Sequence, residues 1–216
     1  MIMKKLASHE EWLAERKFRI GGSDAACLIG RNPYKTNVDL FREKTGRAEP
    51  PDLSKNESVR YGTEAERHIR NLFALNHPRY KVGYEENNLF LNPEAPFAHA
   101  SLDGWLTEPV TGLRGVLEIK TSTINAKGQL AVWKRRVPDH YYCQVQWYLM
   151  VTGYTFGWLY ALLREPFTGT SDEGAEIRGY YIPRDEEAIK MLRDAGERFY
   201  RALEADEEPA LILPEI

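Results

Sequence analysis

The sequence predicts an α/β (α+β) fold in which a central mixed β-sheet is flanked by helices. Short apolar segments rich in β-branched and aromatic residues alternate along the chain with segments of helical periodicity. With 216 residues, of which 43% are hydrophobic, the chain is long enough to bury one sizeable core. We therefore expect one domain over residues 1–216, ending in an acidic and apolar tail at 206–216.

Capping and turn residues predict the helices of the first half. A Gly-Gly turn separates the first two helices, and a polar loop with prolines at 48–56 precedes the longest one. The predicted helices span residues 10–17, 23–29, 37–44 and 57–75.

Most strands are predicted in the middle and second half of the chain. The strands are expected at 81–84, 89–91, 97–106, 113–121, 155–163 and 176–182. A helix or loop at 125–136, a helix at 138–151 that starts at Pro138, and a final helix at 184–203 complete the order. A short loop through Pro109 and Gly112 should connect strands 97–106 and 113–121 as a hairpin.

This hairpin carries two acids and a lysine. Because side chains alternate along a strand, Glu118 and Lys120 share one face and Ile119 points to the other, while the hairpin brings Asp103 near Glu118. Buried carboxylates are costly unless they are neutralised or bind a metal, and such oxygen ligands suit Mg²⁺ or Mn²⁺. The pattern favours a metal site in which Lys120 orients a water. A structural ion pair is the alternative.

The helix at 57–75 contributes another acid. Val59, Gly62, Glu66, Ile69 and Phe73 recur at steps of three or four residues and form one stripe. The stripe is otherwise apolar, so Glu66 requires a partner inside the protein. It is interpreted as a further carboxylate of the metal site, and an ion pair with a core Lys or Arg is the alternative.

The N-terminal region has the features of an anion pocket. Ser23 follows the Gly-Gly turn at a helix start, where free N–H groups bind phosphate, and Arg16 and Arg19 stand just upstream. Ordinary capping by Ser23 or Asp24 explains the same residues and is compatible with an anion pocket.

A glutamine lies on an aromatic helix face farther along the chain. Gln144 shares this face with Tyr141 and Tyr148, and its amide could bind a phosphate, a site carboxylate or the main chain. His99 and His140 are the histidines nearest the proposed site, and neither is assigned a role.

Charge and composition narrow the class of protein. The net charge is −3, yet 119–138 holds no acid, whereas 165–216 holds fourteen acidic and six basic residues. The basic residues of segment 119–138 are Lys120, Lys127, Lys134, Arg135 and Arg136. They predict a surface for a polyanion or, equally, an ordinary exposed loop. The tail is either a docking element or a frayed end.

The cysteines and the N-terminus indicate an intracellular protein. Cys27 and Cys143 are far apart and lie in apolar surroundings, which is typical of buried thiols in a reducing compartment. The N-terminus lacks a signal-peptide pattern and no apolar run is long enough to span a membrane. We expect a cytoplasmic protein. Because no Ser/His/Asp or Cys/His arrangement appears, a small-molecule hydrolase is disfavoured.

Taken together, these motifs resemble the lambda-exonuclease/YqaJ-like viral recombinase family of the PD-(D/E)xK nuclease superfamily, from about Trp12 to Gly153. In this family a proline usually precedes the first catalytic aspartate, whereas here Leu102 precedes Asp103. The matching residues are Trp12, Arg16 and Ser23 with Ile20-Gly21-Gly22-Ser23-Asp24-Ala25-Ala26; Asn32-Pro33-Tyr34; Tyr61-Gly62-Thr63 with Glu66; Ala100-Ser101 with Asp103-Gly104; Leu117-Glu118-Ile119-Lys120-Thr121; and Pro138, Tyr141, Gln144 and Gln146 with Val151-Thr152-Gly153.

The resemblance implies a restriction-endonuclease-like core, an activity, and a source in a bacterial host cell or a prophage. Members digest one strand of linear duplex DNA from its 5′ end with Mg²⁺ (Mn²⁺ as substitute), leave a 3′ single strand for an annealing protein, and form ring-shaped homotrimers. The implied metal ligands are Asp103, Glu118, Glu66 and the Ile119 carbonyl; Lys120 would position the water; and Arg16, Ser23, Ser101 and Gln144 would contact the 5′ phosphate or DNA.

Two alternatives remain open at this point. One is a structure- or sequence-specific endonuclease built on the same core. The other is a non-catalytic DNA-binding recombination accessory protein, in which the acidic cluster is a structural ion network.

Overall fold

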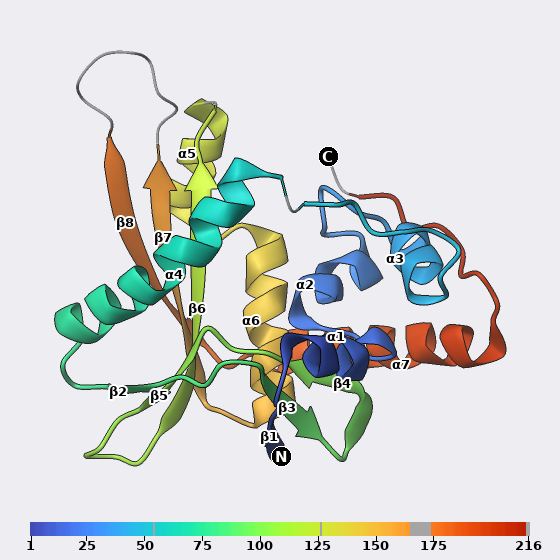
Figure 1. Cartoon of the computed structure of the whole chain (residues 1–216), viewed down its shortest axis with the longest axis horizontal. Coiled ribbons are helices and arrows are strands. Elements are labelled where there is room, and N and C mark those ends of the chain that lie inside the picture. Colours follow the sequence, from blue (N-terminus) through green and yellow to red (C-terminus); the bar gives the residue numbers. More distant parts are fainter. Residues whose placement is uncertain (54, 126, 165–173, 215–216) are drawn as a thin grey trace.

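A five-stranded mixed sheet forms the centre of the computed structural model, which describes residues 1–53, 55–125, 127–164 and 174–214 (Figure 1). Its strands, in spatial order, are β2 (Lys81–Gly83), β5 (Gly104–Thr107), β6 (Arg114–Thr123), β7 (Phe156–Arg164) and β8 (Ala175–Pro183). β6 and β7 are parallel, and the other neighbours are antiparallel. The predicted mixed sheet and the hairpin of β5 and β6 are confirmed.

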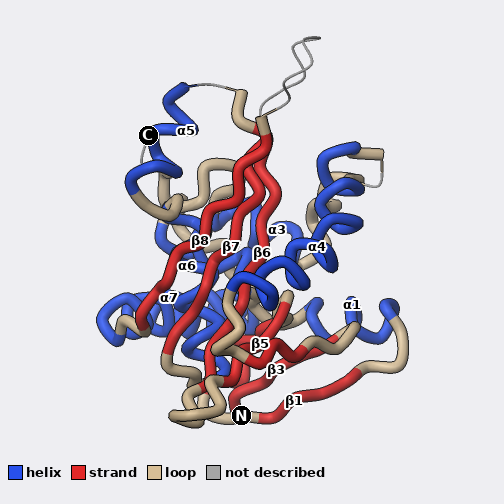
Figure 2. The backbone as a smooth tube through the Cα atoms, turned by 90° about the vertical axis from the view of Figure 1, so that its left-hand side faces the viewer, coloured by secondary structure: helices blue, strands red, loops and turns tan. Residues whose placement is uncertain are grey.

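A smaller antiparallel sheet lies beside the N-terminal helices (Figure 2). It consists of β1 (Ile2–Lys5), β3 (Asn88–Asn92) and β4 (Ala95–Ala100), with β3 in the middle. The sequence did not predict β1, because four mostly exposed residues carry no readable alternation. β1 instead owes its strand conformation to pairing with β3, more than eighty residues away.

Helices cover both faces of the large sheet. Four helices begin near their predicted starts, where side-chain caps from Ser8, Thr36, Asn56 and Asp185 fix the ends. The 14-residue helix at 139–152 follows Pro138 without a side-chain cap. The helices are α1 (His9–Lys17), α2 (Gly22–Ala25), the 3₁₀ turn η1 (Ala26–Ile29), α3 (Asn37–Lys44), α4 (Glu57–Asn76), α5 (Lys127–Arg135), α6 (Asp139–Thr152) and α7 (Glu186–Ala205). The predicted helix at 23–29 is thus two short elements. Within the described ranges, no helix has the length and apolar character to cross a lipid bilayer.

The alternation predicted for β6 is confirmed by the two hydrophobic clusters. Leu117 and Ile119 pack in one cluster with Phe73 of α4, whereas Val116 packs in the other with Val145 of α6. Glu118 and Lys120 therefore point toward the α6 side. The stripe predicted on α4 is buried only in its C-terminal part, because Val59 is exposed.

The prediction for residues 97–106 was wrong. A single strand over 97–106 was expected, but the chain leaves the small sheet after Ala100 and enters the large sheet at Gly104. The reason is that side chains replace strand partners at the junction. The side chain of Asn88 accepts from the Leu102 N–H at 2.8 Å and donates to its carbonyl at 2.9 Å. These two side-chain hydrogen bonds satisfy the main chain of Leu102, which a continuous strand would satisfy by pairing with a neighbouring strand.

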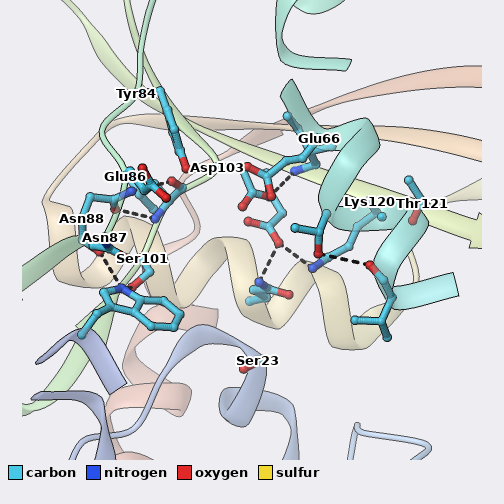
Figure 3. Close-up of a pocket in the computed structure, with 18 of the residues that line it drawn as sticks. Ser23, Glu66, Tyr84, Glu86, Asn87, Asn88, Ser101, Asp103, Lys120 and Thr121 are labelled. Carbon is cyan, nitrogen blue, oxygen red and sulfur yellow. Dashed lines mark hydrogen bonds and ion pairs between the residues drawn. The ribbon is translucent and has the colours of Figure 1, made fainter. Parts of the chain in front are cut away.

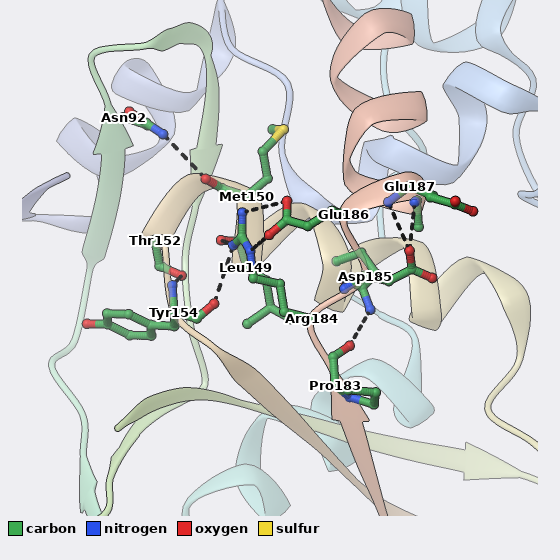
Figure 4. A network of polar contacts seen from close by, with 12 residues as sticks. Asn92, Leu149, Met150, Thr152, Tyr154, Pro183, Arg184, Asp185, Glu186 and Glu187 are labelled. Atoms are coloured by element: carbon green, nitrogen blue, oxygen red, sulfur yellow. Dashed lines mark hydrogen bonds and ion pairs between the residues drawn. The ribbon is translucent and has the colours of Figure 1, made fainter. Parts of the chain in front are cut away.

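A polar network joins the end of β8 to helices α6 and α7 (Figure 4). Arg184 donates to the main-chain carbonyl of Leu149 and pairs with Glu186. The Asp185 N–H donates to Gln146 of α6 at 3.1 Å, and the Asp185 carboxylate caps α7. Because α6 is fixed at this end, its inward face is held against β6 and β7.

The tail packs against the protein's own surface. Asn37, only 2% exposed, donates to the Ala210 carbonyl at 2.8 Å and accepts from the Ile212 N–H at 2.9 Å. Glu208 pairs with Arg42 at 2.8 Å. Residues 208–212 are therefore not frayed, whereas Leu211, Ile212 and Leu213 are exposed, so a docking role of the tail stays a prediction. Residues 215–216 of the predicted tail lie outside the described residues.

The two thiols behave as expected from their surroundings. Cys27 and Cys143 are both free and buried, which confirms the prediction for them. Burial raises the pKa of Cys27 to about 12 and that of Cys143 to about 11, so both thiols are protonated and unreactive at neutral pH.

Candidate active site

A cleft of about 640 Å³ opens between α1, α4, α6 and the edge of β6 (Figure 3). Its lining includes every residue that the sequence predicted for the site. These are Arg16, Ser23, Glu66, Ser101, Asp103, Glu118, Ile119, Lys120 and Gln144. Residues from five separate segments of the chain thus converge on one cavity.

The cleft exists because β5 is shorter than β6. β5 begins at Gly104, opposite Leu117, so the rest of β6 pairs with β7 alone and leaves its other edge open. The Ile119 N–H at this edge donates to the Asp103 carboxylate at 2.8 Å. Since the N–H and C=O of one strand residue point to the same edge, the Ile119 carbonyl also faces the cleft.

Glu118 is the most deeply buried acid of the cleft, with 1% exposure. Its Oε1 accepts from Lys120 Nζ and from Gln144 Nε2, both at 2.6 Å. Its Oε2 is buried and has no hydrogen-bond partner among the described residues. Burial, followed by repulsion from Asp103, raises the pKa of Glu118 to about 8. A buried carboxylate oxygen left without a partner is unfavourable unless a cation or a proton binds it, and the raised pKa of Glu118 expresses this requirement.

Lys120 neutralises part of this negative charge. Burial opposes its ionisation, but the carboxylates of Glu118 and Asp103 more than compensate and raise the pKa of Lys120. Its ammonium also lies 5.0 Å from the centre of the Tyr141 ring. Lys120 therefore remains charged and is held in one place, as both the metal-site and the ion-pair interpretations require.

Glu66 approaches from α4 and pairs with Arg70 one turn later. Burial and then the Asp103 carboxylate raise the pKa of Glu66 to about 7, and burial raises that of Asp103. Arg70 also donates to the Asp103 main-chain carbonyl and lies over the Tyr84 ring. The pair of Glu66 with the buried Arg70 matches the ion-pair alternative of the sequence analysis, which named neither Arg70 nor Tyr84. The spacing of Glu66 and Arg70 is that of a helix ion pair.

The N-terminal side of the cleft contains Arg16, Ser23 and Ser101. The Arg16 guanidinium stacks 3.7 Å from the centre of the Trp12 ring, and the Trp12 indole donates to Ser101 Oγ at 3.1 Å. Arg19 pairs instead with Glu15 at 3.0 Å. Between the two arginines, only Arg16 lines the cleft.

Asp24, rather than Ser23, makes the capping contact at the start of α2. Its carboxylate accepts from the Gly21 N–H at 3.1 Å and pairs with Lys44 at 3.1 Å. The exposed Ser23 hydroxyl faces the cleft.

Gln144 takes one of the three partners considered for it. Its amide nitrogen donates to Glu118 and, at 2.9 Å, to the Tyr148 hydroxyl. Both N–H groups are thereby used, so in this arrangement Gln144 orients a site carboxylate. A contact between Gln144 and phosphate stays a prediction.

The predicted basic segment contributes little to the cleft. Lys120 lines it, whereas Lys134 and Arg136 lie in other depressions of the surface. A polyanion surface along α5 therefore stays a prediction.

The donors in the cleft match a hard divalent cation in kind. Among the described residues, no three His, Cys, Asp or Glu side chains are arranged as a metal-binding group. Asp103, Glu118 and the Ile119 carbonyl nevertheless offer oxygen only, the donor type that Mg²⁺ and Mn²⁺ prefer. Together with the unpartnered Oε2 of Glu118, this donor set fits such an ion.

The fold is that of known exonucleases. An alkaline exonuclease from Laribacter hongkongensis, LHK-Exo, superimposes with a TM-score of 0.68 over 91% of this chain and 93% of that chain, at 20% identity. Its complex with dAMP gives a TM-score of 0.70 over the same shares, also at 20% identity. A phage-related exonuclease from Haemophilus somnus 129PT gives 0.54 over 87% and 96% of the two chains, at 16% identity.

The sequence comparison is more specific. Residues 11–155 match the model of the YqaJ-like viral recombinase domain, and the chain belongs to this family. The uncharacterized protein YqaJ of Bacillus subtilis (strain 168) is 30% identical over 194 residues, which cover 89% of this chain and 56% of that protein. The chain therefore spans little more than half the length of this curated relative.

Proposed function

We propose that the chain is a Mg²⁺-dependent 5′-to-3′ exonuclease that digests one strand of linear double-stranded DNA. The proposal rests mainly on the buried, unpartnered Oε2 of Glu118 beside Asp103 and Lys120 at the open edge of β6. Membership of the viral recombinase family and the exonuclease fold support a nuclease. They leave the cation and the direction of digestion to experiment.

The residues of the cleft have distinct parts in this reaction. Asp103, Glu118 and the Ile119 carbonyl would hold the cation, with Glu66 nearby. Bound Mg²⁺ would polarise the scissile phosphate and acidify the attacking water. Lys120 would orient that water and offset the negative charge that develops in the transition state. Gln144 would fix the rotamer of Glu118 through the hydrogen bond described above.

The N-terminal side of the cleft would receive the end of the strand. Arg16, held flat against Trp12, presents a guanidinium suited to a terminal phosphate, and Ser23 and Ser101 add hydroxyl groups. We further propose that the product is a 3′ single-stranded overhang used by a single-strand annealing protein. The proposed assembly is a homotrimeric ring around the DNA.

The test compares three DNA substrates with Mg²⁺ and with EDTA. We expect rapid loss of the 5′-phosphorylated strand of a linear duplex, slower loss of the 5′-hydroxyl strand, and no cleavage of a covalently closed circle. Asp103→Asn should abolish cleavage and weaken Mg²⁺ binding in calorimetry. Cleavage of the circle would instead indicate an endonuclease, and no Mg²⁺-dependent release of nucleotides would indicate a non-catalytic DNA-binding protein.

A further inference from the structure

Arg70 is a buried cation that has no role in the reaction proposed above. It is 8% exposed, and its guanidinium contacts three separate parts of the chain. It donates to the Asp103 main-chain carbonyl, pairs with Glu66, and lies 3.5 Å from the centre of the Tyr84 ring. Its three partners Glu66, Tyr84 and Asp103 all line the cleft, so this buried arginine is positioned to control their geometry.

The contact with Asp103 falls at the junction of the two sheets. The chain is in neither sheet at 101–103, and Leu102 is held by Asn88. Arg70 fixes the next carbonyl, that of Asp103, while the Asp103 carboxylate accepts from the Ile119 N–H at 2.8 Å. The position of this carboxylate therefore depends on a main-chain segment that Arg70 anchors to α4.

The contact with Glu66 fixes the second acid. Glu66 and Arg70 are one turn apart on α4, and their ion pair is largely buried. Tyr84 closes the other side of the guanidinium, which leaves it little freedom to rotate. The planar fork thus sets the distance between the Glu66 carboxylate and the Asp103 main chain.

We infer that Arg70 is a positioning residue that sets the spacing of the Asp103 and Glu66 carboxylates for a divalent cation. This inference rests on the proposed function. Arg70 itself would not touch the cation or the DNA. Its effect is geometric, since a guanidinium makes both contacts at once in a fixed plane, whereas a lysine ammonium of the same charge cannot.

The experiment measures Mn²⁺ binding by calorimetry, without DNA, on wild-type protein, Arg70→Lys and a control. Arg79→Lys is the control, because Arg79 also lies over a tyrosine ring and near a glutamate, outside the cleft. If Arg70 positions the ligands, Arg70→Lys raises the dissociation constant about tenfold or more and Arg79→Lys leaves it unchanged. Thermal unfolding of each protein separates this effect from loss of the fold.

A wild-type dissociation constant in folded Arg70→Lys would overturn the inference and leave the proposed function standing. Absence of Mn²⁺ binding to the wild-type protein would overturn both. If Arg70→Lys does not fold, variants of Tyr84 provide the second test, because the Tyr84 side chain is exposed and can be replaced without loss of the core. Tyr84→Leu should then weaken Mn²⁺ binding, whereas Tyr84→Phe keeps the ring and the affinity. Equal affinity in these two variants would overturn the inference.

Discussion

At the scale of single residues, the cleft combines two arrangements that are usually treated as alternatives. Glu118 and Lys120 form a buried ion pair, and one oxygen of the same carboxylate still lacks a partner. A purely structural ion pair is favourable only when the remaining lone pairs are satisfied as well. This is why the geometry favours a cation site that includes the ion pair.

Replacement of Lys120 tests its part in the reaction. We expect Lys120→Ala to reduce cleavage about a hundredfold or more, because the developing negative charge loses its cation. The protein should still fold and bind duplex DNA. Single-turnover cleavage and DNA-binding titrations measure the two effects, with Lys190→Ala, an exposed lysine of α7 outside the cleft, as control. Near wild-type cleavage by Lys120→Ala would contradict the assignment.

The buried His99 predicts how stability depends on pH. It is 2% exposed, and burial, followed by repulsion from Arg16, lowers the pKa of His99 to about 3. Between about pH 6.5 and pH 3 the unfolded chain binds a proton that the folded protein excludes. As the pH is lowered through this window, the free energy of unfolding should therefore decrease by about 1.4 kcal/mol per pH unit for this one group.

Urea unfolding at several pH values measures this dependence. His99→Gln should show a shallower loss of stability on acidification than the wild-type protein. The same change at His68, which is exposed on α4, is the control. An identical slope in His99→Gln and wild type would show that another group is responsible.

At the scale of elements, the spacing between β7 and α6 holds Gln144 over Glu118. β7 has a glycine, Gly157, where it passes under α6, and a Cβ added there would lie 2.5 Å from Val145 Cγ1. Val145 is adjacent to Gln144, so a shift of α6 at this point would move the amide away from the carboxylate.

Gly157→Ala should therefore destabilise the protein by about 1–3 kcal/mol through overpacking. Adding Val145→Ala should recover part of this loss, because the second change removes the clashing methyl groups. Urea unfolding of the two single variants and the double variant gives the coupling energy. Strictly additive effects would mean that the two residues do not compete for space.

Local patterns were sufficient to predict much of the site. The alternation along β6 and the hairpin with β5 depend on residues close in sequence, so Glu118, Lys120 and Asp103 could be placed from the sequence. The split between β4 and β5 could not, because the side chain of Asn88 causes it through bonds to Leu102. Similarly, the contact of Arg70 with the Asp103 carbonyl spans more than thirty residues and leaves no periodic signal.

At the scale of the whole molecule, the tail ties the C-terminal end to the N-terminal third. The Asn37 side-chain amide bonds to the Ala210 carbonyl and to the Ile212 N–H at once, as the main chain of a neighbouring strand would. The ion pair of Arg42 with Glu208 reinforces this contact at the surface. This clamp, in which Asn37 holds the main chain of residues 210–212, cannot be read from the sequence, since Asn37 and Ile212 are 175 residues apart.

Asn37→Ala should release the tail. We expect a loss of about 1–3 kcal/mol of stability, because the main-chain groups lose their partner. The Ile212 amide should exchange faster and residues 206–214 should become sensitive to proteases. Arg42→Ala, which removes an exposed ion pair, should cost less stability than Asn37→Ala. Unchanged exchange at Ile212 in Asn37→Ala would contradict the clamp.

The parallel pairing of β6 with β7 has a consequence for biosynthesis. Parallel neighbours need a long crossover, and here α5 and α6 supply it together with Gln144. During synthesis, β6 leaves the ribosome before this crossover. Until the crossover follows, the acids of β6 lie on a strand that has no β7 to pair with and no α6 to pack against. Under the proposed function, the nascent enzyme would therefore be inert toward DNA until the crossover and β7 have left the ribosome.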